Sequence, residues 1–523
     1  MYIFASRPCL IFSGFITIVF AYLIHKFSSA PLYKHILSPI DAWKINLLDS
    51  SYDKLPITSV SLVSLLDISY IEKSKQIVQT TIEDISLFAQ PSLDNKLHAW
   101  ERGIPVSEVI ALAQYWLNTS SPSTPWSIET SETIQKLQQY PAYEIIIQQL
   151  PLRFLHILPL TNQYNKKNKH LDQECIPVLL IHGWPGSILE FLDIIPYLLD
   201  ANYCLIIPSL PGYGFSNNYT SSSLSTGLDP VVIAEVFLVL MRQLNYSHYY
   251  VQGGDWGGII ATLMAQIDYD YSITYSDQYE LPRIQGLHLN FITPNHPFLP
   301  LYYLLSNYLP KTWFFHNNQN IERAYALGIR IPGAIFLNKL FYPSTLSSSL
   351  MDSTGTVIMS GLYELTGYFH EQSTRPDTLG IALTASPFGF LSWVLEKFYE
   401  WSDPRTKKYI HSSSELLQIF NPDWLMANAM LYIGTHSITS SLRLYYEAIH
   451  SYRFLHGLTT KVQAKVWIAD FPYEIGRCSE SLLKYRFPNL YNISTMERGG
   501  HFAAVQEPEL LANDIIMALE RMR

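Results

Sequence analysis

A strand-to-helix segment rich in glycine constrains this chain more than any other feature. Residues 249–258 read Tyr-Tyr-Val-Gln-Gly-Gly-Asp-Trp-Gly-Gly, so an apolar run enters a glycine turn. Gly253, Asp255 and Gly257 have the spacing of the nucleophile elbow, a strained turn that exposes its central side chain above a sheet. Aspartate stands where serine is usual. Because a carboxylate there forms an ester with its substrate, the motif indicates displacement at a saturated carbon.

The composition limits the class of protein. The 523 residues are 48% hydrophobic and 15% charged, which is typical of a globular chain with a large core. Two domains, or one domain with a large insertion, are expected from this length. The formal net charge is −9 and there is no long basic run, so we expect no nucleic-acid partner. The 36 tyrosines and 11 tryptophans suit an aromatic-lined apolar pocket, although most are expected to be ordinary core residues.

The four cysteines predict no disulfide framework. They are Cys9, Cys175, Cys204 and Cys478, and the first lies in a leading apolar stretch. Three remain for the folded domain, so a reducing compartment is favoured.

The N-terminus is expected to anchor the chain in a membrane. Residues 10–24 are almost wholly apolar, although a spanning helix usually takes about 20 residues. A cleaved signal peptide is the alternative, with Ser28-x-Ala30 as its site, but Pro31 would hinder cleavage. Basic residues are more numerous after the segment than before it, which favours a single-pass anchor with a cytosolic body.

Apolar runs suited to buried parallel strands alternate with helical segments. We expect strands at 176–181, 203–207, 249–252, 284–290, 462–469 and 490–496, and helices at 230–244, 257–266 and 508–522. Asp229 is expected to cap the first of these helices. The pattern predicts an α/β-hydrolase fold, with a mostly parallel sheet and helices on both faces.

Other segments depart from this alternation. Residues 292–450 are expected to be mostly helical, as a lid inserted into the sheet domain. Upstream, helices are expected near 70–88 and 108–117, and a strand at 143–157. The polar stretch 268–281 is expected to be a surface loop.

Three further motifs surround the elbow. The run 182–186, His-Gly-Trp-Pro-Gly, follows the first core strand, where this fold supplies an oxyanion-hole N–H group. Since Pro185 has no N–H group, the backbone of Trp184 is the candidate donor, together with that of Trp256. A tight glycine turn with a packed core histidine is the alternative interpretation.

A base and an acid are expected after the later strands. His501 follows the last strand and precedes the closing helix, so it is the candidate base. Asp470 and Glu474 both lie near the end of the preceding strand, and either could orient the imidazole. Chain topology alone slightly favours Asp470.

Together the motifs resemble those of the microsomal-type epoxide hydrolases, which include the juvenile hormone epoxide hydrolases of insects. The resemblance covers about residues 95–523 and rests on runs beginning at His182, Pro211, Gly253, Arg375, Leu395, Phe471 and Arg498. It implies a membrane anchor at 1–30, a meander segment at 31–160, a hydrolase core at 161–291 and 456–523, and a helical lid at 292–455.

The resemblance also implies roles for individual residues. Asp255 falls on the family nucleophile, His501 on the base and Glu474 on the acid, which replaces the topological preference for Asp470. The two lid tyrosines that bind the epoxide oxygen fall on Tyr368 and Tyr445. Tyr446 is the alternative if the last assignment is shifted by one residue.

The implied activity is hydrolysis of lipophilic epoxides to vicinal diols through an aspartyl ester, with water as co-substrate and the endoplasmic reticulum membrane as location. No cofactor is expected, and no metal-ligand spacing is found in the sequence. A haloalkane dehalogenase has the same nucleophile, base and fold, but would need halide donors such as tryptophan side chains. A non-catalytic lipid-binding protein on the same fold is the third alternative.

Overall fold

The computed structural model of the chain describes the sheet domain, part of the lid and part of the N-terminal segment. The residues described are 45, 47, 49, 51, 52, 55–88, 100, 103–117, 126–159, 175–217, 228–275, 283–292, 360–409, 412–476 and 480–523. The predicted anchor at 1–30 and the first part of the predicted lid, 293–359, lie outside these residues. Among the described residues no single helix is long and apolar enough to cross a membrane. The helices α14 Pro376–Ala385 and α15 Pro387–Glu400 pass the same length and composition criteria only as a pair, which is bent by 117°.

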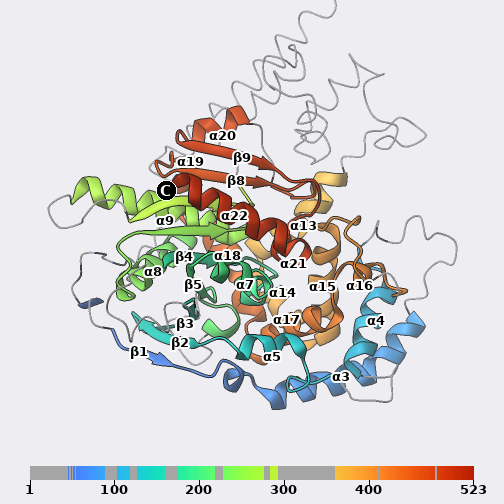
Figure 1. Ribbon diagram of the computed structural model, residues 1–523. Helices are drawn as coiled ribbons and strands as arrows, with labels where there is room; N and C mark the ends of the chain where they lie inside the picture. The colour runs from blue at the N-terminus through green and yellow to red at the C-terminus, as the bar shows by residue number, and fades with distance from the viewer. Residues whose placement is uncertain are drawn as a thin grey trace, which may run out of the picture.

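A nine-stranded sheet organises the molecule, with the order β1-β2-β3-β5-β4-β6-β7-β8-β9 (Figure 1). The strands are β1 Ile57–Ser59, β2 Ala142–Ile147, β3 Leu150–Ile157, β4 Ile176–Ile181, β5 Tyr203–Pro208, β6 Tyr249–Gly253, β7 Ile284–Leu289, β8 Val466–Asp470 and β9 Leu490–Thr495. From β5 to β9 all neighbours are parallel, whereas β1, β2, β3 and β5 pair antiparallel. In the central register Val178 of β4 lies between Leu205 and Tyr250. These apolar central strands confirm the predicted α/β class.

Helices cover both faces of the parallel part. The core helices are α7 Ile195–Asp200, α8 Pro230–Gln243, α9 Asp255–Thr274, α20 Glu480–Arg486, α21 Ala503–Gln506 and α22 Pro508–Met522, with short 3₁₀ turns η5 Ile188–Phe191 and η6 Gly214–Ser216. The β4–α7–β5 connection runs along the sheet in the opposite direction from β5–α8–β6 and β6–α9–β7. Right-handed crossovers therefore put α7 on one face and α8 and α9 on the other. Asp229 caps α8, as predicted, by accepting from the Val231 and Val232 N–H groups.

Two predicted elements differ from the structure. The expected strand at 143–157 is a hairpin of β2 and β3, which turns at Gln148 and Gln149, both with positive φ. The elbow helix does not stop near residue 266 but continues to Thr274. The helix continues because Ile267 and Tyr271, one turn apart, pack on the core, and because the buried Asp268 accepts from the Ile284 N–H group at 3.0 Å.

The lid lies between β7 and β8 in the chain. Its described helices are α13 Ser360–Thr374, α14 Pro376–Ala385, α15 Pro387–Glu400, α16 Glu415–Ile419, α17 Pro422–Gly434, α18 Ile438–His450 and α19 Tyr452–Thr459. Four N-terminal elements, η3 Val63–Leu65, α3 Ile68–Phe88, α4 Val106–Leu117 and α5 Glu132–Gln138, precede or flank β2. Of these, α3 and α4 pack against α15 and α17, so the N-terminal segment supports the lid from outside (Figure 1).

A buried carboxylate joins the N-terminal segment to the lid. Asp423 at the start of α17 accepts from the Trp126 indole N–H at 2.7 Å, and from the backbone N–H and hydroxyl of Thr133 at 2.8 and 2.6 Å. Because this carboxylate satisfies several buried donors at once, it fixes the start of α17 relative to the segment 126–133.

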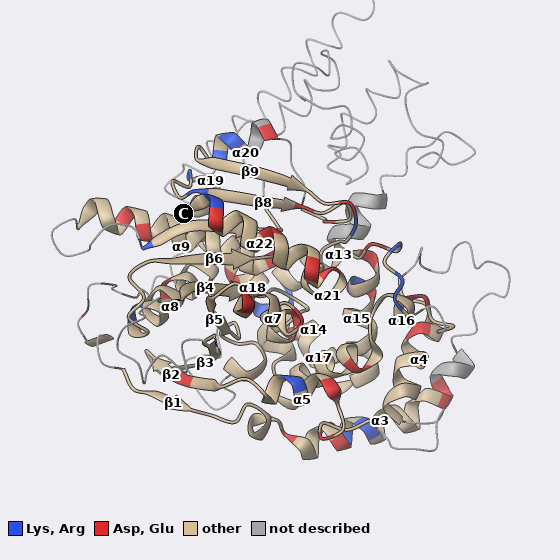
Figure 2. Ribbon diagram, viewed as in Figure 1, with Lys and Arg blue, Asp and Glu red and all other residues tan. Residues whose placement is uncertain are grey.

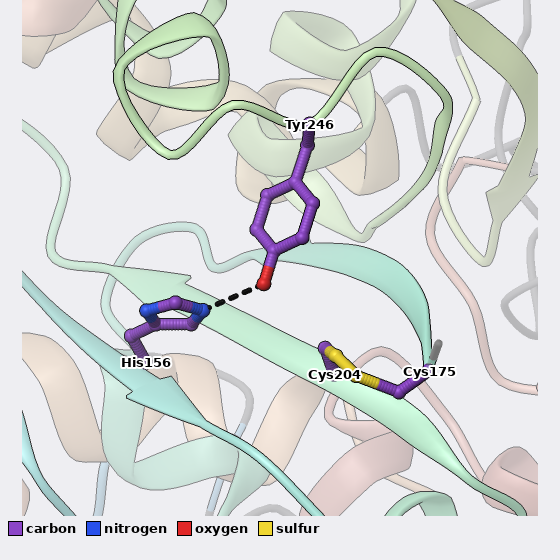
Figure 3. Close-up of a disulfide and its surroundings, with 4 residues drawn as sticks. All are labelled: His156, Cys175, Cys204 and Tyr246. Atoms are coloured by element: carbon purple, nitrogen blue, oxygen red, sulfur yellow. Dashed lines mark hydrogen bonds between the residues drawn. A yellow bond between two sulfur atoms is a disulfide. The ribbon is translucent and has the colours of Figure 1, made fainter. Parts of the chain in front are cut away.

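Cys175 and Cys204 form a disulfide between the starts of β4 and β5, with a Cα–Cα separation of 5.5 Å (Figure 3). The expectation of reduced cysteines is therefore wrong for this pair. The parallel register explains the pairing, since Cys204 lies opposite Pro177. Lysine, arginine, aspartate and glutamate residues are scattered over the described elements (Figure 2).

Candidate active site

The elbow places Asp255 at the first residue of α9, directly after β6. Its φ is 49°, in the left-handed region that strains most side chains. The flanking glycines are required by close packing. A Cβ atom on Gly257 would lie 1.9 Å from the Ile181 carbonyl oxygen, and one on Gly253 would lie 2.4 Å from the Gly257 backbone. The turn therefore presents the Asp255 carboxylate at the carboxyl ends of the strands, where ligands bind in parallel α/β sheets.

The loop after β4 supplies a backbone donor to this carboxylate. The Trp184 N–H group donates to Asp255 Oδ1 at 2.8 Å. A Cβ atom on Gly183 would lie 2.2 Å from that oxygen, so only glycine allows this approach. The Trp256 N–H group lies in the first turn of α9, where helix N–H groups have no partner within the helix. The structure thus places the Trp184 donor on the Asp255 carboxylate, and the predicted Trp256 donor is the next residue of the elbow.

His182 holds the donor loop and does not reach the reacting atoms. Its Nδ1 lies 2.9 Å from the Gly183 carbonyl oxygen, and the Leu210 N–H group donates to Nε2 at 3.0 Å. Burial lowers the pKa of this imidazole to about 4, so the ring is neutral. The histidine of this motif is therefore a packed structural residue.

His501 lies between Asp255 and Glu474. Its Nε2 is 3.4 Å from Asp255 Oδ2, and its Nδ1 is 2.8 Å from Glu474 Oε1. The backbone N–H group of His501 donates to the Trp401 carbonyl at 2.9 Å, and that of Gly476 donates to Glu474 Oε1 at 3.0 Å. The contact with Glu474, and not Asp470, is the one that the family resemblance implies. The topological preference for Asp470 fails because the chain turns after β8 and carries residue 474 back toward residues 499–501.

The two carboxylates control the charge of the imidazole. Burial alone would lower the pKa of His501, but the charges of Glu474 and Asp255 and the hydrogen bonds to them raise it to about 10. The imidazole of the resting site is therefore protonated at neutral pH, with Glu474 and Asp255 as its neighbouring carboxylates. An ionised carboxylate beside an imidazolium is ready to act as a nucleophile.

Two tyrosines of the lid face the same region. Tyr368 on α13 and Tyr445 on α18 have ring centroids 5.9 Å apart, and each packs against Trp184 at 5.6 and 5.8 Å. Burial and the negative charge of Asp255 raise the pKa of both phenols, so they stay protonated and remain hydrogen-bond donors. Tyr446, the alternative assignment, instead stacks on His450 at 3.9 Å.

Of the two phenols, Tyr445 has the hydroxyl whose hydrogen bonding best indicates a role as a donor to substrate. It is buried and lies within interaction distance of the Tyr368 hydroxyl and the Trp256 indole, but neither contact has ordinary hydrogen-bond geometry. Its ring is fixed at 4.9 Å from Trp256 in an edge-to-face contact. A buried donor whose hydrogen bonds are poorly formed is costly, and active sites are where such donors are found.

Sequence reasoning did not identify Glu190, Gln252 and Asn290. With Asp255 and His501 they line a cavity of about 20 Å³ next to the nucleophile. Glu190 follows the run 182–187 by three residues, and Gln252 directly precedes the elbow, so their positions beside two singled-out motifs were the available signal. Within the described ranges no group of three or more His, Cys, Asp or Glu side chains could hold a metal ion.

Comparisons with known proteins agree with this geometry. Residues 66–191 match the family model described as epoxide hydrolase N terminus, and residues 176–273 match the alpha/beta hydrolase fold. The juvenile hormone epoxide hydrolase of Bombyx mori is 34% identical over 78% of this chain and 77% of its own length, and epoxide hydrolase 1 of Sus scrofa is 32% identical over 81% and 82%. The crystal structure of the juvenile hormone epoxide hydrolase from the silkworm Bombyx mori has a TM-score of 0.62 and 28% identity, and covers 91% of this chain and 96% of that one. The chain belongs to the epoxide hydrolase family.

Proposed function

We propose that this chain converts lipophilic epoxides to vicinal diols through an ester on Asp255. One arrangement carries the proposal: the Asp255 carboxylate lies 3.4 Å from a core imidazole, and its charge acts on two phenols of the lid that pack on Trp184. The imidazole can remove a proton from water, and the phenols can donate hydrogen bonds to an oxygen on which negative charge develops.

In the first step Asp255 attacks one carbon of the epoxide ring. The new bond joins the Asp255 oxygen to that carbon, and the bond between the carbon and the ring oxygen breaks. Because an alkoxide is a poor leaving group at neutral pH, the Tyr368 and Tyr445 hydroxyls donate hydrogen bonds to the ring oxygen as its charge develops. The product is an alkyl ester of Asp255 that carries a neighbouring hydroxyl.

The proton of that hydroxyl comes from the protonated His501 of the resting site. The pKa of His501 is raised to about 10, with Asp255 as one of the causes, so esterification of Asp255 removes part of what holds the proton. The imidazolium then gives up the proton that the ring oxygen keeps, with the phenols as intermediaries. His501 is neutral after this step and can act as a base.

In the second step neutral His501, held by Glu474, removes a proton from water. The hydroxide attacks the ester carbonyl carbon, and the Trp184 and Trp256 N–H groups stabilise the tetrahedral oxyanion. Collapse breaks the bond between the carbonyl carbon and the alcohol oxygen. The proton of the regenerated carboxyl goes to the departing alkoxide, so Asp255 and the imidazolium return to their starting states.

Mass spectrometry of the intact protein tests the scheme. After incubation with an epoxide, H501Q is expected to gain the mass of one epoxide on Asp255, more slowly than the wild-type protein because water then supplies the proton that the imidazolium gives, whereas D255A is expected to gain none and to form no diol. An H501Q protein that stays unmodified while the wild-type protein makes diol would contradict the ester mechanism. A screen of styrene-type, terpenoid and fatty-acid epoxides then defines the substrate class.

The aromatic surroundings support lipophilic substrates. Tyr368 packs on Trp401 at 5.0 Å, and Phe369 packs on Tyr445 at 5.5 Å, so the walls beside the nucleophile are apolar rings. One observation favours the haloalkane dehalogenase alternative: the buried Trp184 indole N–H has no hydrogen-bond partner among the described residues. The paired phenols and the family membership favour the epoxide. Chloride release from a haloalkane would support the alternative.

For location, we propose a single-pass anchor in residues 1–30 that holds a cytosolic catalytic domain at the endoplasmic reticulum membrane. The basic residues after the apolar segment support this orientation. The Cys175–Cys204 disulfide supports the opposite one, because disulfides persist in oxidising compartments. Protease treatment of intact microsomes distinguishes the two: digestion of the catalytic domain supports the cytosolic side, and protection would overturn it.

A further inference from the structure

Glu190 is a carboxyl group held rigidly beside the catalytic pair. It lies in η5, directly after the loop that supplies the Trp184 donor, and α21 packs against this turn. The carboxyl folds back over Gly186, where a Cβ atom would lie 1.4 Å from Glu190 Oε1. A hydrogen bond from the Ser187 backbone N–H helps to hold it there. Glycine at 186 is therefore what allows this carboxyl to reach the site.

The cavity that Glu190 lines has the size and polarity of a water site. Its volume is about 20 Å³, whereas one water molecule needs about 10–15 Å³ and two to four polar partners. Polar residues that also line it are His182, Asp255, His501, Gln252 and Asn290. Gln252 donates to Asn290 Oδ1 at 2.8 Å, but its own Oε1 is buried and finds no partner in the described ranges. An acceptor is thus left over for a water molecule.

The charge of Glu190 fits the same interpretation. Burial raises the pKa of this carboxyl to about 8; the His501 charge opposes the rise and the Asp255 charge adds to it. The group is mostly neutral near pH 7, so it does not compete with Glu474 for the imidazolium. A neutral carboxyl still offers one donor and one acceptor to water.

We propose that Glu190 is a positioning residue for the second step, and that its carboxyl holds the attacking water between His501 and the carbonyl carbon of the Asp255 ester. The inference rests on the proposed function, because only an esterified Asp255 needs water at this place. The phenols that serve the first step lie on lid helices, whereas Glu190 lies in the core. The two steps should therefore depend on Glu190 to different extents.

Rapid-quench mass spectrometry measures the two steps separately. With an epoxide that the wild-type protein converts, E190A is expected to form the Asp255 ester within about threefold of the wild-type rate and to hydrolyse it at least about tenfold more slowly. E190Q keeps a donor and an acceptor, so it should restore most of the hydrolysis rate. E520A removes an exposed glutamate of α22 and should match the wild-type protein in both steps.

Each contrary result has a distinct meaning. If E190A slows ester formation and hydrolysis equally, or slows neither, Glu190 does not position the water and the inference is overturned. If E190Q is as slow as E190A while both proteins unfold at the wild-type temperature, hydrogen bonding by residue 190 is not the cause and the inference also fails. A wild-type protein that makes diol without ever forming the ester would instead refute the proposed mechanism.

Discussion

Replacing Tyr445 by phenylalanine should affect the free energy of unfolding and the rate of ester formation in different ways, because only one hydroxyl is removed. The substitution removes only the hydroxyl, which is buried and makes only poorly formed contacts with the Tyr368 hydroxyl and the Trp256 indole. The ring contacts with Trp256 at 4.9 Å and Trp184 at 5.8 Å remain. Leaving a buried polar group unpaired costs about 1–3 kcal/mol. We therefore expect Y445F to keep the wild-type free energy of unfolding or to gain up to about this amount.

The same substitution should slow the first chemical step strongly. A single preorganised donor to a developing oxyanion contributes about 10²–10³ in rate, or about 2.7–4 kcal/mol. Ester formation by Y445F is therefore expected to fall about 10²–10³-fold, while hydrolysis of preformed ester changes by less than about threefold. Rapid-quench mass spectrometry gives the two rates, and thermal unfolding gives the stability.

The neighbouring tyrosine provides the matched control. Tyr446 stacks on His450 on the same helix, so Y446F makes the same chemical change away from the site. It should leave both rates unaltered. The reasoning would be refuted if Y445F formed the ester at the wild-type rate, or if Y446F were the slower variant. A Y445F protein that lost several degrees of thermal stability would show that the hydroxyl has a structural partner.

Three further predictions follow from described contacts. H501Q should accumulate the Asp255 ester and form diol about 10²–10⁴-fold more slowly, measured by intact mass and diol release. In the wild-type protein, ester hydrolysis should speed up as pH rises, because this step needs neutral His501. The inflection of the rate should lie below the resting His501 pKa of about 10, because esterified Asp255 no longer carries the charge that helps to raise this pKa. An inflection at or above that pKa would contradict this effect of the Asp255 charge. D423A should lose about 3 kcal/mol of stability in chemical unfolding, because several buried donors lose their acceptor; D377A, which removes an exposed ion pair with Arg443, should lose less than about 1 kcal/mol.

Local patterns in the sequence were sufficient for the sheet and the nucleophile. Strands such as β4 and β5 are buried on both faces, so their apolar runs are continuous and their type is unambiguous. The elbow was also identified from a local pattern, because Gly253, Asp255 and Gly257 lie within five consecutive residues that follow an apolar run. These features needed no knowledge of distant parts of the chain.

Features that depend on distant contacts could not be derived in this way. Nothing local distinguishes Glu474 from Asp470 as the partner of His501, since the choice depends on how the loop after β8 pairs with residues 499–501. Tyr368 and Tyr445 lie on separate helices and meet only through lid packing, so family resemblance was the sole guide to them. Glu190 was missed because a glutamate in a short turn ordinarily faces solvent, and only Gly186 lets this one fold inward.

The arrangement of donors around Asp255 explains why the two chemical steps should be separable by mutation. The nucleophile lies at the boundary between lid and core, with the phenols of α13 and α18 on one side and the Trp184 loop, His501 and Glu190 on the other. Charge develops on the ring oxygen in the first step and on the ester carbonyl oxygen in the second. Since each oxygen meets a different set of donors, a lid substitution should act on ester formation and a core substitution on hydrolysis. The exception is His501, whose positive charge assists the first step and whose neutral form performs the second.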